Sequence, residues 1–211
     1  MRSLVKNPKN AKALVVLGHG AGAGMRHPFM ESTAELLYRQ QIATFRYEFT
    51  YMEQGRKRPD PPRALLARIR EALSAGPRKV PGLPVIAGGK SMGGRMTSVA
   101  LAESPADGVA GLLFLGFPLH APGKGDEAGV KRAEHLFEIG LPMLLVQGTR
   151  DRLAELDKIR GLCRSIGKRA TLHVVEGADH SFNVLKRSGR DQSEVMEEIA
   201  DAVSSWINQI V

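Results

Sequence analysis

The chain has 211 residues, of which 43% are hydrophobic and 25% are charged. This composition is that of an ordinary globular protein, and it excludes a disordered or fibrous chain. The formal net charge is +8, and the segment 56–79 holds eight Lys or Arg residues against Asp60 and Glu71. This basic segment is suited to an acidic partner, although a solvated helix face is the simpler interpretation. We do not expect nucleic-acid binding, because no aromatic residues alternate with the basic ones.

The length fits one domain that spans residues 1–211. Its longest apolar stretches, 13–18 and 109–117, are far shorter than a membrane span, so we expect no membrane segment. The basic start of the chain is followed by too brief an apolar run for a signal peptide, which favours the cytoplasm. The single cysteine, Cys163, excludes an internal disulfide and is expected to be a packed core thiol.

Strand-like and helical segments alternate along the chain. Six apolar runs predict strands at 13–18, 42–49, 83–88, 109–117, 141–147 and 170–175. Amphipathic patterns predict helices at 28–40, at 61–73, after Ser91, after Asp126, at 152–166 and at 192–210. We therefore predict an α/β fold with a doubly wound, mostly parallel sheet of about six strands. In such a sheet the ligand lies at the carboxyl ends of the strands.

A glycine-rich turn with one serine follows the third predicted strand. Residues 87–95 read "AGGKSMGGR", so Ser91 is flanked by Gly89 and Gly93 in the pattern G-x-S-x-G. The pattern is short, and a simple glycine-rich turn is the alternative. Its place between a strand and a helix is typical of a nucleophile elbow, in which small neighbours relieve a sharp turn. A phosphate-binding P-loop is excluded because Pro84 stands where its first glycine is required.

A nucleophilic serine needs a base, and the base needs a carboxylate that orients it. His180 is the best base because it lies in a glycine-containing loop after the last predicted strand, and Asp151, after "LLVQGTR", is the leading orienter. Asp179 is adjacent to His180, so a turn-forming role suits it better. Five other histidines compete for the role of the base: His19, His27, His120, His135 and His173. The chain order Ser91, Asp151, His180 is the order expected for an α/β-hydrolase.

The developing oxyanion of such a reaction needs two backbone donors. The stretch "GHGAGAG" at 18–24 follows the first predicted strand, and we assign the N–H groups of Ala21 and Met92 to this role. A dinucleotide site is not supported, since the glycine pattern fails at Ala23 when it is started from Gly18, and again at Met25 when it is started from Gly20. We expect no cofactor and no metal.

Five segments occur in an order that carries a family resemblance: "HGAGAG", "GKSMGGR", "GFPLHAPGK", "QGTRD" and "GADHSF". Over nearly the whole chain the sequence resembles small, lidless α/β-hydrolases related to dienelactone hydrolases. The resemblance implies no cap domain, since the segment after residue 117 is too short for one. Dienelactone hydrolases proper use a cysteine nucleophile where this chain has Ser91, so their lactone substrate is not carried over. The family's first two strands are expected to be missing.

The resemblance implies a serine hydrolase of the carboxylesterase or thioesterase type, acting on a small ester-like substrate through an acyl-enzyme. Two alternatives stay open. One is a catalytically silent interaction module that uses the basic surface, since the same branch of the family includes a non-catalytic scaffold subunit of a chromatin acetyltransferase complex. The other is an acyltransferase or peptidase that keeps the triad. Lys90, His120 and Lys124 are not assigned to the site.

Overall fold

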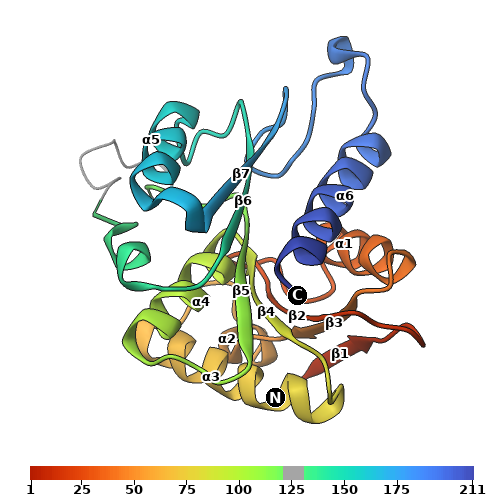
Figure 1. Ribbon diagram of the computed structural model, residues 1–211, viewed down its shortest axis with the longest axis vertical. Coiled ribbons are helices and arrows are strands. Elements are labelled where there is room, and N and C mark those ends of the chain that lie inside the picture. The colour runs from red at the N-terminus through yellow and green to blue at the C-terminus, as the bar shows by residue number, and fades with distance from the viewer. Residues whose placement is uncertain (121–130) are drawn as a thin grey trace.

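The computed structural model describes residues 1–120 and 131–211, and its centre is a seven-stranded sheet (Figure 1). The strand order is β1-β3-β2-β4-β5-β6-β7. The strands are β1 (Ser3–Lys6), β2 (Leu14–Gly18), β3 (Ala43–Tyr47), β4 (Val85–Lys90), β5 (Val109–Leu115), β6 (Met143–Gly148) and β7 (Ala170–Val175). All neighbouring pairs are parallel except β1 and β3. The predicted mostly parallel α/β sheet is therefore confirmed.

Strand β1 is an addition to the six predicted strands. It pairs antiparallel with β3 at the edge of the sheet, and Val5 is 39% exposed. The expectation that the family's first two strands, which precede the strand predicted at 13–18, are missing is therefore wrong for one of them. The sequence "SLVK" gave little signal, because a four-residue edge strand buries too few side chains to form an apolar run.

Helices cover both faces of the sheet, as Figure 1 shows. α1 (Pro28–Arg39) and α6 (Gln192–Ile210) pack on one face, and α3 (Pro62–Lys79), α4 (Met92–Glu103) and α5 (Leu156–Ile166) pack on the other. Side chains of β2 alternate between the two cores: Leu14 and Val16 face α3 and α4, whereas Val15 and Leu17 face α1 and α6. The short elements are α2 (Thr50–Glu53), η2 (Glu134–Glu138), η3 (Gly167–Arg169) and η4 (Lys186–Ser188).

Two helices differ from the sequence prediction. α3 continues to Lys79 although Gly76 and Pro77 are helix breakers. A Cβ atom on Gly76 would lie 2.9 Å from Val16 and 3.4 Å from Phe45, so the glycine allows this part of the helix to pack closely on β2 and β3. The helix expected after Asp126 is not found between residues 131 and 142, where the longest helical element is the 3-10 helix η2. Residues 121–130, including Lys124 and the start of that predicted helix, lie outside the described part of the chain.

The predicted core thiol is confirmed, since Cys163 on α5 is buried and burial raises its pKa to about 11. Among the helices in the described ranges, none combines the length and the apolar character needed to cross a bilayer.

The direction of the strand order reverses at the centre of the sheet. From β2 the chain goes to β3 on one side, and from β4 it goes to β5 on the other side. The loops after β2 and β4 therefore leave the sheet in opposite directions and open a crevice at the carboxyl ends of these strands. The glycine-rich loop 18–24 and the turn at Ser91 lie at this crevice.

Candidate active site

The turn at Ser91 connects β4 directly to α4 and holds the serine in an uncommon backbone conformation. Ser91 has φ 51° and ψ −115°. A Cβ atom on Gly89 would lie 2.2 Å from the carbonyl oxygen of Gly18, and a Cβ atom on Gly93 would lie 2.3 Å from the same oxygen. Both glycines are therefore required by the close approach of this turn to the end of β2, and the turn has the form of a nucleophile elbow.

His180 lies in the loop after β7, with its ring beside the serine. The distance from His180 Nε2 to Ser91 Oγ is 2.8 Å. The loop is held by Asp179, whose Oδ1 accepts hydrogen bonds from the backbone N–H groups of Ser181 and Asn183 at 2.8 and 2.9 Å. Phe182, two residues after His180, is fully buried. The loop is thus fixed by Asp179 before His180 and by Phe182 after it.

Asp151 follows β6 and contacts the other nitrogen of the same imidazole. Its Oδ2 lies 2.7 Å from His180 Nδ1, and its side chain is fully buried. A carboxylate here accepts the Nδ1 proton, which leaves the Nε2 lone pair directed at Ser91. The structure therefore brings Ser91, His180 and Asp151 together in one hydrogen-bonded row.

Gln147 in β6 orients the carboxylate and was missed in the sequence. Its Nε2 donates to Asp151 Oδ2 at 2.6 Å, and its Oε1 accepts from the Phe117 backbone at 3.0 Å. The backbone N–H of Leu153 donates to Asp151 Oδ1 at 2.7 Å. The signal in the sequence was one polar residue at the end of the apolar run "MLLV", and Gln147 is indeed fully buried.

Lys90, within the elbow, reaches under the histidine loop. Its Nζ donates to the backbone oxygen of His180 at 2.5 Å and lies over the rings of Phe29 and Phe182, 5.7 and 5.2 Å from their centroids. Burial lowers the pKa of Lys90 to about 8, although the carboxylates of Asp151 and Asp179 act in the opposite direction. Lys90 thus ties the elbow to the loop that carries the base.

The lowered pKa of Lys90 predicts a specific pH dependence of stability. In the unfolded chain a lysine keeps a pKa near 10.4, so between about pH 8 and pH 10 the unfolded state binds more protons than the folded one. The penalty for burying the charge is therefore complete below pH 8 and disappears as the pH rises. The free energy of unfolding of the wild type, relative to Lys90→Met, is expected to rise by about 2 to 3 kcal/mol between pH 7 and pH 10.

Urea unfolding at several pH values measures this difference. Lys79→Met is the matched control, because Lys79 is exposed at the end of α3. Parallel pH profiles for the wild type and both variants would show that Lys90 is charged and well solvated in the folded protein.

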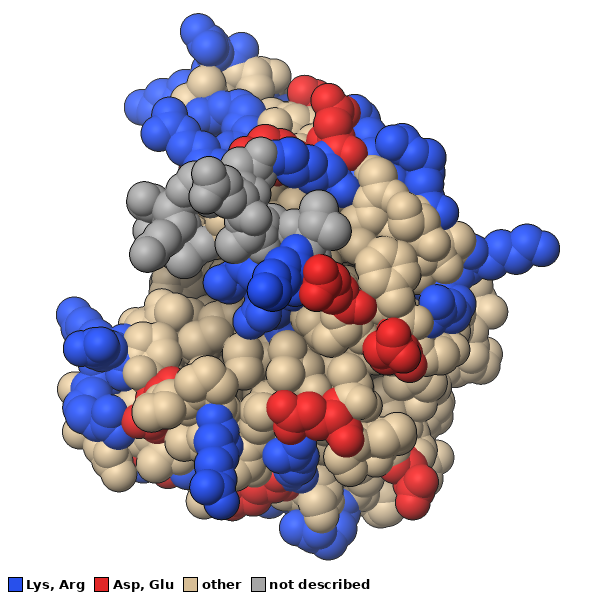
Figure 2. All heavy atoms as spheres, turned by 90° about the vertical axis from the view of Figure 1, so that its left-hand side faces the viewer, with Lys and Arg blue, Asp and Glu red and all other residues tan. Residues whose placement is uncertain are grey.

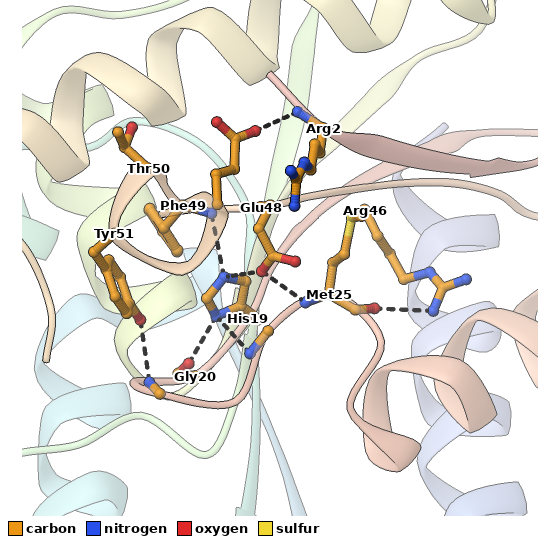
Figure 3. A network of polar contacts seen from close by, with 12 residues as sticks. Arg2, His19, Gly20, Met25, Arg46, Glu48, Phe49, Thr50 and Tyr51 are labelled. Carbon is orange, nitrogen blue, oxygen red and sulfur yellow. Dashed lines mark hydrogen bonds and ion pairs between the residues drawn. The ribbon is translucent and has the colours of Figure 1, made fainter. Parts of the chain in front are cut away.

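The loop after β2 is held from behind by a buried polar network, drawn in Figure 3. His19 is fully buried, and its Nδ1 lies 2.8 Å from the backbone oxygen of Gly20 and 3.3 Å from the backbone nitrogen of Gly24. Its Nε2 lies 2.9 Å from Glu48 Oε1, and the same oxygen accepts from the Met25 backbone at 3.0 Å. The Tyr51 hydroxyl accepts from Gly22 N–H at 3.1 Å. The network therefore fixes the position of the loop 18–24, whose Gly and Ala residues have no side chains that could form such contacts.

The two predicted oxyanion donors lie on either side of the crevice. Ala21 and Met92 both line the cavity in front of Ser91. The N–H groups of residues 22–25 all have protein acceptors, whereas neither Ala21 nor Met92 donates its N–H to an acceptor among the described residues. Met92 is also the first residue of α4, where backbone donors have no partner within the helix. Both donors are therefore free for a ligand oxygen.

The cavity has a volume of about 490 Å³ and is lined by Ser91 and His180. The other histidines have different contacts. Nδ1 of His27 caps α1, His173 pairs with Glu198, His135 contacts Ser98 and His120 pairs with Glu155 across 3.7 Å while lining the cavity. His180 is thus the histidine that the fold brings to Ser91.

The fold and this site together define a class. A mostly parallel sheet with an elbow after a central strand, and an acid and a histidine after later strands, is the arrangement of the α/β-hydrolases. The chain belongs to this family: the family model described as an alpha/beta hydrolase domain matches residues 11–208.

Solved structures with the same fold include esterases and a dienelactone hydrolase. Dienelactone hydrolase from Anabaena variabilis is 20% identical, with a TM-score of 0.75, and the match covers 99% of this chain and 91% of that one. Est1E from Butyrivibrio proteoclasticus, with bound ferulic acid, is 16% identical, with a TM-score of 0.72 and coverage of 99% and 94%. An alpha-beta serine hydrolase homologue from Coxiella burnetii is 18% identical, with a TM-score of 0.70 and coverage of 93% and 90%.

These findings confirm the resemblance to small α/β-hydrolases of the dienelactone hydrolase-like group. At identities of 20% and below, the solved structures establish the fold and leave the substrate open. No cap domain is present in the ranges 1–120 and 131–211.

Proposed function

We propose that the protein is a serine hydrolase that cleaves carboxylic esters or thioesters through an acyl-enzyme. The observation that carries this proposal is the row of hydrogen bonds from Asp151 through His180 to Ser91, which opens into a cavity with two unpaired backbone donors. A serine that served only the fold would need neither the buried carboxylate behind its histidine nor free donors in front of it.

The reaction follows from the positions of these groups. His180 Nε2 removes the hydroxyl proton as Ser91 Oγ attacks the substrate carbonyl, and Asp151 stabilises the imidazolium that forms. The N–H groups of Ala21 and Met92 stabilise the oxyanion. His180 then gives its proton to the leaving alcohol or thiol, and the ester to Ser91 is hydrolysed by a water molecule that His180 activates. These steps need only the side chains and backbone of this chain, the substrate and water. That the protein uses no cofactor and no metal stays a prediction.

The alternatives find less support. An interaction module on the basic segment 56–79 would not need the row of hydrogen bonds from Asp151 to Ser91, and three of the eight cations of the segment pair with carboxylates: Arg56 with Asp60, Arg68 with Glu53 and Arg70 with Glu103. The face seen in Figure 2 carries both basic and acidic side chains. An acyltransferase or peptidase would share the acyl-enzyme and differ only in the acceptor or the leaving group. An acidic partner of segment 56–79 and the cytoplasmic location remain predictions.

Labelling with a fluorophosphonate probe tests the proposal, because this reagent reacts rapidly only with an activated serine beside an oxyanion hole. We expect fast labelling of the native chain and mass-spectrometric assignment of the adduct to Ser91. Heat-denatured protein is the control for non-specific reaction. A native chain that is labelled no faster than the denatured one would contradict the serine-hydrolase function.

A further inference from the structure

The charges around the cavity are of one sign. Lys90, Arg95 and Arg132 contribute to its lining, whereas no Asp or Glu does so among the described residues. Lys90 is committed to the backbone oxygen of His180. The other two cations are one guanidinium on α4 and one in the segment that precedes η2.

Arg95 and Arg132 lie close together, and neither has an acidic partner in the part of the chain that the structure describes. Arg95 Nε donates to the backbone oxygen of Arg132 at 3.3 Å, and Arg95 Nη1 lies 3.6 Å from Met96 Sδ. Arg132 Nε is buried without any hydrogen-bond partner. Within the described ranges, neither guanidinium forms an ion pair with a carboxylate. Burial lowers the pKa of Arg95 to about 10, and the charge of Arg132 adds to this effect.

Two other arginines of the fold are neutralised by carboxylates. Arg46 is 4% exposed and pairs with Glu31 at 3.0 Å, and Arg68 is 8% exposed and pairs with Glu53 at 2.9 Å. Arg95 and Arg132 are half-buried, and withdrawing a guanidinium even partly from water without a counter-charge is unfavourable, while a second one beside it adds repulsion. Because no carboxylate of the described residues neutralises this pair, it is suited to an anion supplied from outside.

The position of the two arginines indicates that the anion is part of the substrate. Ser91, Arg95 and Arg132 line the same cavity, and Arg95 lies in the first turn of α4, directly after the elbow. An anion held by the two guanidinium groups therefore lies in the space that a substrate at Ser91 occupies. Planar guanidinium groups match the two oxygens of a carboxylate and also bind phosphate oxygens.

We propose that Arg95 and Arg132 form an anion subsite and that the substrate is an ester or thioester bearing a carboxylate or phosphate group. This inference rests on the proposed hydrolase function and adds the substrate class. Both guanidinium groups line the cavity that contains Ser91, and their Nη atoms carry the donors that a ligand anion would use.

The test compares two esters of equal chain length that differ in one charge. Mono-4-nitrophenyl adipate carries a free carboxylate, and its methyl ester, methyl 4-nitrophenyl adipate, is neutral. For the wild type we expect kcat/KM to favour the anionic ester by roughly 10- to 100-fold, the range of hydrogen bonds to charged groups. Arg95→Gln and Arg132→Gln are each expected to lower this preference about tenfold or more. Arg63→Gln, an exposed residue at the start of α3, is the matched control and should keep the preference.

Two further measurements separate the possible outcomes. Competitive inhibition by butanoate and by inorganic phosphate distinguishes a carboxylate from a phosphate as the preferred anion. Binding of monomethyl and dimethyl adipate to Ser91→Ala by calorimetry tests the subsite without any turnover, so it remains decisive if the hydrolase function fails. Equal rates for both esters, or equal binding of both adipates, would overturn the anion subsite. Fluorophosphonate labelling of Ser91 would show separately whether the hydrolase function holds.

Discussion

Ser91→Ala is expected to abolish fluorophosphonate labelling and to lower ester hydrolysis by on the order of 10⁶-fold, toward the uncatalysed rate. The substitution removes the one oxygen that lies 2.8 Å from His180 Nε2, and no other hydroxyl contacts that nitrogen among the described residues. The loss should appear in kcat, because the cavity and both backbone donors remain. Steady-state kinetics with a 4-nitrophenyl ester and probe labelling measure it.

The same variant should fold as well as the wild type. The elbow is dictated by the close approach of Gly89 and Gly93 to Gly18, which the substitution leaves in place. The melting temperature of Ser91→Ala should therefore stay near that of the wild type and of Ser32→Ala, an exposed control on α1. A serine needed for the fold would instead leave its buried partner unsatisfied, at a cost of about 1 to 3 kcal/mol. Lost stability together with unchanged hydrolysis would contradict a catalytic role.

The sequence predicted the parts of this molecule that depend on local pattern. The six predicted strands are rich in apolar residues, and β2, β3, β4 and β6 are buried along their whole length because both faces of the sheet are covered. The residues Ser91, Asp151 and His180 follow the carboxyl ends of β4, β6 and β7. The convergence of these three residues follows from the parallel topology, in which all such ends meet at one edge. Edge strand β1 and the last turns of α3 depend on contacts with β2 and β3, so local pattern could not predict them.

The residues that support the site are those that the sequence did not assign. Gln147 acts on Asp151, and Lys90 contacts the backbone of a residue ninety positions further along the chain. His19 was considered as a base, but the structure places it behind the glycine-rich loop, against Glu48. Each of these side chains gains its role from a partner distant in sequence. The spacing of the motifs predicts the candidate catalytic residues, whereas the packing that orients them is visible only in the three-dimensional structure.

Asp151→Asn is expected to lower kcat/KM by about three to four orders of magnitude while the protein stays folded. The wild-type carboxylate only accepts hydrogen bonds, and it receives them from His180 Nδ1, Gln147 Nε2 and the Leu153 backbone. An asparagine NH₂ group must replace one of the two oxygens. At the Oδ1 position this NH₂ group faces the N–H donor of Leu153. At the Oδ2 position it faces the donors of both Gln147 and His180.

The reduced activity has two physical causes. With the NH₂ group toward His180, the imidazole must hold its proton on Nε2, and it then cannot accept the proton of Ser91. With the oxygen toward His180, the tautomer is kept, but the negative charge that stabilises the imidazolium in the transition state is gone. Both orientations therefore slow the attack, and neither removes the ring from the serine.

Asp179→Asn is the matched control for this prediction. Its Oδ1 accepts from the backbone of Ser181 and Asn183, and an asparagine oxygen can accept both bonds, so activity should stay within a few-fold of the wild type. Steady-state kinetics and circular dichroism of the two variants decide between the carboxylates. If Asp151→Asn stayed active and Asp179→Asn did not, the orienting role would pass to Asp179. The 2.7 Å contact between Asp151 and His180 would then be an ion pair that stabilises the loop without contributing to catalysis.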